Sequence, residues 1–92
     1  MRNASRIPAV ELSESDQVHI SSLVVHCRPE FLENTEAKIS ALPDAEVHAN
    51  DDNGKLIVVL ETKHEKDILN SISMIENIEG VLGANMVFHQ ID

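Results

Sequence analysis

The sequence predicts an α+β sandwich, in which two helices pack on one face of a four-stranded antiparallel sheet. Four segments of the chain have the apolar, β-branched composition of strands. Two other segments repeat apolar residues at three- and four-residue steps, which is the spacing of one helix face. The segments follow the order strand, helix, strand, strand, helix, strand.

The first strand and the first helix are predicted from residues 18–43. Residues 18–27 are rich in Val and Ile and predict a strand. Pro29 follows at a position suited to the first turn of a helix, and Pro43 ends that helix. Its apolar face consists of Phe31, Leu32, Thr35, Ile39 and Leu42.

A hairpin is predicted next. Residues 45–50 alternate small apolar with polar side chains, which is typical of a half-exposed edge strand. Residues 51–54 end in Asn53-Gly54, a strong hairpin signal. Residues 55–61 are almost wholly aliphatic and form the third strand.

The second helix and the last strand complete the order. Thr62, three residues before Glu65, resembles a capping box at the helix start. Gly80 is placed at the helix C-terminus, and residues 81–90 form the last strand. The apolar face of the helix consists of Ile68, Leu69, Ile72, Ile75 and Ile78.

With right-handed crossovers, this order gives a ferredoxin-like sandwich with strand order 4-1-3-2. Residues 18–92 are therefore predicted to form one domain. Residues 1–17 show no sustained apolar period and are predicted to be a flexible tail.

An uncovered apolar face follows from the same strands. Three of them are apolar on both parities, whereas a sheet with one face in water alternates. An apolar face that the chain cannot cover usually receives a partner. Judged by side-chain size, the residues that face the helices are Leu23, Val25, Leu56, Val58, Leu60, Leu82, Ala84, Met86 and Phe88. The residues expected on the other face are Ile20, Ser22, Val24, His26, Ile57, Val59, Gly83, Asn85, Val87 and His89, and strand parity adds Glu46 and Glu61.

Charge and composition restrict the partners. The formal net charge of −9 opposes nucleic-acid binding and favours cationic partners. The chain has no apolar run long enough for a membrane span and no secretory signal, so a cytoplasmic location is expected. Its one cysteine, Cys27, excludes an intrachain disulfide and is expected to behave as a small hydrophobe.

Catalytic and metal chemistry are not predicted. The five histidines have no short ligand spacing, and there is no phosphate loop or nucleophile motif, so we expect no metal, no cofactor and no enzymatic activity. An alternative function is an ACT-like small-ligand-sensing or dimerising regulatory domain, because Ile78-Glu79-Gly80-Val81 resembles the helix-to-strand step of such domains.

Five segments together resemble the NapD family. They are residues 21–25, 42–43 followed by 45–48, 54–59, 78–82 and 87–90. The resemblance implies a cytoplasmic chaperone that binds the twin-arginine signal peptide of NapA, the catalytic subunit of the periplasmic nitrate reductase. We expect the protein to be monomeric. Such a chaperone holds back export until the molybdenum cofactor and the iron–sulfur cluster are in place. The residues expected to bind the peptide are Ile20, Ser22, Val24, His26, Glu46, His48, Ile57, Val59, Glu61, Asn85, Val87 and His89.

Overall fold

The computed structural model describes residues 18–91, with side chains described as far as His89. The predicted tail, residues 1–17, lies outside the described residues, as does residue 92. The elements in chain order are β1 (His19–Cys27), a 3₁₀ turn (Pro29–Phe31), α1 (Leu32–Ser40), β2 (Ala45–Asp51), β3 (Lys55–Thr62), α2 (Glu65–Glu76) and β4 (Val81–Ile91).

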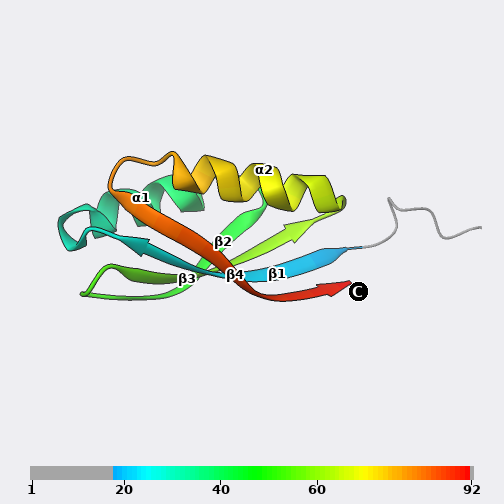
Figure 1. The fold of residues 1–92 in the computed structure, drawn as a ribbon, viewed down its shortest axis with the longest axis horizontal. Coiled ribbons are helices and arrows are strands. Elements are labelled where there is room, and N and C mark those ends of the chain that lie inside the picture. The colour runs from blue at the N-terminus through cyan, green and yellow to red at the C-terminus, as the bar shows by residue number, and fades with distance from the viewer. Residues whose placement is uncertain (1–17, 92) are drawn as a thin grey trace, which may run out of the picture.

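The four strands form one antiparallel sheet in the order β2-β3-β1-β4, which confirms the predicted 4-1-3-2 topology. Both helices lie on the same side of this sheet (Figure 1). The central strands are therefore β1 and β3, and the edge strands are β2 and β4. This arrangement is the ferredoxin-like sandwich expected from the element order.

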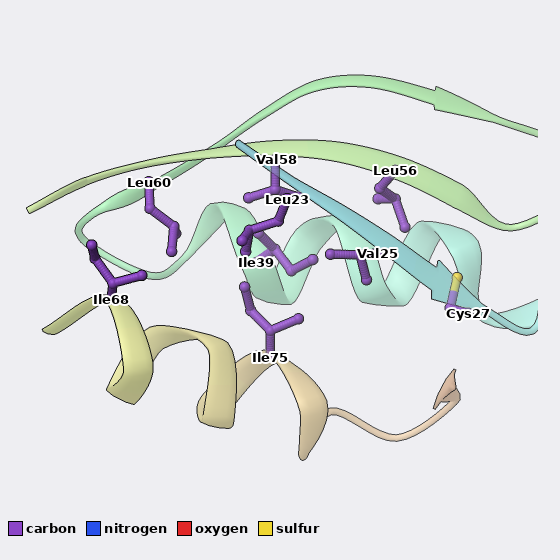
Figure 2. Packing of buried hydrophobic residues seen from close by; sticks show 9 residues of the cluster. All are labelled: Leu23, Val25, Cys27, Ile39, Leu56, Val58, Leu60, Ile68 and Ile75. Carbon is purple, nitrogen blue, oxygen red and sulfur yellow. The ribbon is translucent and has the colours of Figure 1, made fainter. Parts of the chain in front are cut away.

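The hydrophobic core fills the space between the sheet and the helices. Alternate residues of the two central strands point into it, as the sequence predicted, and α1 and α2 contribute the rest (Figure 2). The fully or almost fully buried hydrophobic residues are Leu23, Val25, Cys27, Ile39, Leu56, Val58, Leu60, Ile68 and Ile75. Cys27 is a free, buried thiol, in agreement with its predicted role as a small hydrophobe.

Two turns depend on glycine. Gly54 has a φ of 96° and closes the β2–β3 hairpin, where a Cβ would collide with the carbonyl oxygen of Cys27. Gly80 has a φ of 94°, and a Cβ there would collide with the ring of Phe31. α2 ends at Glu76, so Gly80 lies in the turn that enters β4 rather than at the helix C-terminus.

The start of α2 also differs from the prediction. Thr62 belongs to β3, opposite His19 on β1, and the N-cap residue of α2 is His64. The Thr62 hydroxyl donates to the carbonyl oxygen of His64 over 3.2 Å, so no capping box forms. Leu69, predicted within the apolar stripe of α2, is 65% exposed because it lies at the margin of the helix face that carries Ile68 and Ile75.

Candidate functional site

The face of the sheet opposite the helices, here called the open face, is lined at its centre by aliphatic side chains. Strand pairing sets Val24 of β1 opposite Ile57 of β3, and Ser22 opposite Val59. Paired residues on neighbouring strands share a face, so these four side chains lie together. Each of them is half-buried, as is Ile20. Among residues 18–91, no helix or strand covers this face (Figure 1).

The central strands agree with the sequence-based assignment of faces. Leu23 and Val25 of β1 are fully buried on the helix side, and Ser22, Val24 and His26, which alternate with them, are not buried. Leu56, Val58 and Leu60 are likewise fully buried on β3. Ile20, Ser22, Val24, His26, Ile57, Val59 and Glu61 therefore lie on the open face, as expected.

Strand β4 agrees with the prediction only from Gly83 to Met86. Ala84 and Met86 pair with Val25 and Leu23 and share the helix side with them. Gly83 and Asn85 pair with His26 and Val24 and lie on the open face, as expected. Leu82, predicted to face the helices, is an extra residue at an irregularity between the His26 and Cys27 pairings, and it is 69% exposed.

A second irregularity reverses the faces of the end of β4. Phe88 pairs with Ser22 although Met86 pairs with Leu23, so Val87 is an additional residue in the strand. Phe88 is therefore on the open face, 52% exposed, where the sequence predicted the helix side.

His89 is also placed differently from the prediction. It pairs with Ser21, on the helix side of the sheet, instead of facing the open side. Its Nε2 atom lies 3.1 Å from Nδ1 of His19, which forms a hydrogen bond between the two imidazoles. The bulge at Val87 explains both differences from the prediction. One inserted residue moves each later side chain of the strand to the opposite face of the sheet, so Phe88 lies on the open face and His89 lies beside His19.

Strand β2 contributes polar groups to the open face. Glu46 pairs with Val59 and so lies on that face. His48 is the extra residue at an irregularity between the Val47 and Ala49 pairings, and its Nε2 atom lies 3.3 Å from Oε1 of Glu46. Ala49 then pairs with Ile57 on the open face, although simple alternation predicts the helix side.

An acidic recess lies where β3 ends and β2 begins. The recess has a volume of about 470 Å³ and is lined by Pro43, Asp44, Ala45, Glu46, Val59 and Glu61. The backbone N–H of Glu61 donates to the carbonyl oxygen of Asp44 over 2.9 Å, which joins the segment before β2 to the end of β3. The recess thus continues the aliphatic surface at Val59 into a group of three carboxylates.

The open face has an aliphatic centre and a negative end. Within residues 18–91, no three His, Cys, Asp or Glu side chains are grouped to hold a metal ion. In the same part of the chain, no helix is long and apolar enough to cross a membrane.

Comparisons with known proteins identify the family. The model of the family described as NapD protein matches residues 18–92. Chaperone NapD of Escherichia coli K12 is 35% identical over 72 residues, covering 77% of this chain and 83% of the relative. Chaperone NapD of Paracoccus pantotrophus is 38% identical over 78 residues, covering 85% of this chain and 69% of the relative.

A solved structure agrees with these relatives. The solution structure of the E. coli Tat proofreading chaperone protein NapD superposes with a TM-score of 0.74 at 34% identity, covering 79% of this chain and 78% of that one. The fold, the family model and the relatives therefore lead to one conclusion: the chain belongs to the NapD family.

Proposed function

We propose that this protein is a chaperone that binds the twin-arginine signal peptide of the periplasmic nitrate reductase catalytic subunit, NapA. It acts in the cytoplasm as a monomer, without catalysis and without a cofactor of its own. Binding holds back export of NapA until its cofactors are inserted. Membership of the NapD family supports this proposal, and the similar E. coli protein is a Tat proofreading chaperone.

The observation that carries the proposal is the uncovered aliphatic face with its acidic end. A twin-arginine signal peptide has a basic n-region followed by an apolar stretch. Ile20, Val24, Ile57 and Val59 offer the apolar stretch a matching surface, and Glu46 and Glu61 offer carboxylates to the arginines. An arginine guanidinium can bind a carboxylate through two parallel hydrogen bonds, whereas lysine cannot.

The peptide binds as an amphipathic helix laid on the open face. The apolar side of the helix covers the aliphatic centre of the sheet, a recognition mode in which residues at helical spacing act as anchors. The bound helix then supplies the layer that residues 18–91 do not provide on this side. Burial of the apolar side chains supplies most of the affinity, and the arginine contacts supply specificity and orientation.

Calorimetric titration of the full chain with a NapA twin-arginine signal peptide tests the function. Two matched peptides run beside it: the same peptide with both arginines changed to lysine, and a twin-arginine peptide from another exported enzyme. We expect the first to bind and the other two to bind at least tenfold more weakly. Equal affinity for all three would refute a dedicated client, and absence of binding by all three would refute the proposed function.

A further inference from the structure

The open face carries its charge unevenly along the strands. Glu46 and Glu61 lie on it near the end of β3, beside Asp44 of the acidic recess. At the opposite end, Asp51 and Lys55 pair across β2 and β3, so a positive group accompanies the negative one. Within the strands of residues 18–91, Lys55 is the only lysine or arginine on this face, and Lys63, two residues beyond Glu61, lines a neighbouring recess together with Asp44 and Glu61. Three carboxylates against the one lysine, Lys63, leave the end at Glu61 negative, whereas Asp51 and Lys55 balance each other at the opposite end.

The acidic end is open to a cationic ligand. Glu46 pairs with Val59, and Glu61 lies two residues further along β3 on the same face, so the two glutamates are diagonal neighbours about 7–8 Å apart. Glu46 is 79% exposed and contacts His48. In the described part of the chain, no lysine or arginine forms an ion pair with Asp44, Glu46 or Glu61. Two carboxylates at this spacing can each receive one guanidinium of an arginine pair.

The apolar surface extends from the acidic end in one direction only. Three successive rows cross the sheet from β2 to β4, and each row is set by strand pairing. The row nearest the acidic end contains Glu46, Val59, Ser22 and Phe88, the next contains Ala49, Ile57, Val24 and Asn85, and the last contains Asp51, Lys55, His26 and Gly83. The middle row carries no charge, so an apolar segment that starts beside the glutamates covers it before meeting Lys55.

This inference rests on the proposed function and adds the direction of the peptide. We infer that the basic n-region lies over Glu46 and Glu61, and that the apolar segment runs antiparallel to β3 toward Lys55 and His26. The reverse direction would place the arginines beside Lys55 and leave the glutamates without an arginine partner, which is electrostatically unfavourable. From Glu61 to Lys55 the sheet spans six steps of ~3.3 Å, or ~20 Å, which about 13 helical residues cover.

Paramagnetic relaxation enhancement tests the direction. The ¹⁵N-labelled full chain is mixed with signal peptide that carries a nitroxide either before the arginines or after the apolar segment. With the first label, we expect the strongest loss of amide signal at Ile20, Val59 and Glu61. With the second label, we expect it at His26, Lys55 and Gly83. A diamagnetic form of each labelled peptide provides the reference intensities.

Substitution of the carboxylates tests the same inference through affinity. Glu46→Gln/Glu61→Gln should weaken binding of the twin-arginine peptide about tenfold, and should reduce the preference over the double-lysine peptide. Glu33→Gln/Glu76→Gln is the matched control, because it removes two exposed carboxylates from the helices and changes the net charge equally. The control should leave both affinities unchanged within a factor of two.

The possible outcomes separate the two hypotheses. Signal loss in the reversed pattern, or equal effects of the two double variants, overturns the direction while leaving peptide binding intact. Absence of any binding to the unaltered chain overturns the proposed function, and the direction with it. The expected pattern together with selective weakening by Glu46→Gln/Glu61→Gln supports the direction.

Discussion

The two faces of the sheet are built from neighbouring residues of the same strands but have different roles. On the helix side, Leu23, Val25, Leu56, Val58 and Leu60 are fully buried against α1 and α2. On the open face, Ile20, Val24, Ile57 and Val59 are equally apolar in type but only half-buried. The aliphatic composition of these strands therefore exceeds what folding requires. The additional aliphatic residues on the open face are accounted for if a partner covers that face.

Adjacent residues of one type but opposite orientation allow the two faces to be separated by experiment. Three such pairs exist in the central strands: Val25 and Val24, Val58 and Val59, and Ser21 and Ser22. The two members of a pair have the same chemistry and almost the same place along the strand. A difference between their variants therefore reports the face rather than the strand.

The largest effect is expected from a charge in the core. Val25→Asp introduces a carboxylate at a fully buried position, which costs more than about 4 kcal/mol of folding free energy unless the group neutralises. We expect this variant to lose its cooperative thermal transition in circular dichroism. Val24→Asp is half-exposed, so it should remain folded and lose no more than about 1–2 kcal/mol.

In peptide binding Val24→Asp is the informative variant, because it stays folded and should affect affinity more than stability. Val24→Asp places a carboxylate at the centre of the open face, where the apolar side of the peptide is proposed to lie. Its affinity for the signal peptide should fall by at least tenfold, or about 1.4 kcal/mol. If Val24→Asp folds and binds as tightly as the unaltered protein, the binding site is not on this face.

The two edge strands show where sequence reasoning about this sheet reaches its limit. Simple alternation assigned β1 and β3 correctly because each of these strands is paired on both sides, which fixes its register. It failed in part on β2, where His48 is an extra residue, and on β4, where Leu82 and Val87 are extra residues. An edge strand has one free side, so it can accommodate a bulge without disturbing a second neighbour.

Two features of the candidate site are not predictable from the sequence: the bulge at Val87 and the part that Asp44 takes in the acidic recess. Nothing in the residue types of 86–89 distinguishes a bulge at Val87 from regular alternation, so Phe88 was assigned to the core and His89 to the open face. Of the acidic recess, the sequence predicts only that Glu46 and Glu61 lie on the open face. The contribution of Asp44 depends on the backbone hydrogen bond that joins it to Glu61, which is a tertiary contact that no local pattern reveals.

Truncation of a valine should give an intermediate effect. Val58→Ala removes two methyl groups from a fully buried site and leaves a cavity, at a cost of about 2–3 kcal/mol. Val59→Ala, on the open face, should cost less than about 1 kcal/mol because solvent or neighbouring side chains fill the space. Urea denaturation measures both values, with an unchanged m-value as the control for two-state behaviour. Equal losses would mean that the open face is packed as tightly as the core.

The smallest effect concerns the adjacent serines, and its sign is the informative part. Ser21 is fully buried on the helix side, and its hydroxyl has no hydrogen-bond partner within the described residues. A buried hydroxyl without a partner has lost its hydration without compensation, so Ser21→Ala should stabilise the fold by about 1 kcal/mol.

In a domain of this size, that gain raises the Tm by about 4–8 °C in a calorimetric scan. Ser22→Ala is the matched control on the open face, where the half-exposed hydroxyl reaches water, and its stability should change by less than about 0.5 kcal/mol. If Ser21→Ala instead lowers the Tm, the hydroxyl makes a hydrogen bond in solution, for example to a bound water beside the His19–His89 pair. The core would then contain a polar network at this end, and the contrast between the two faces would be one of packing rather than of polarity.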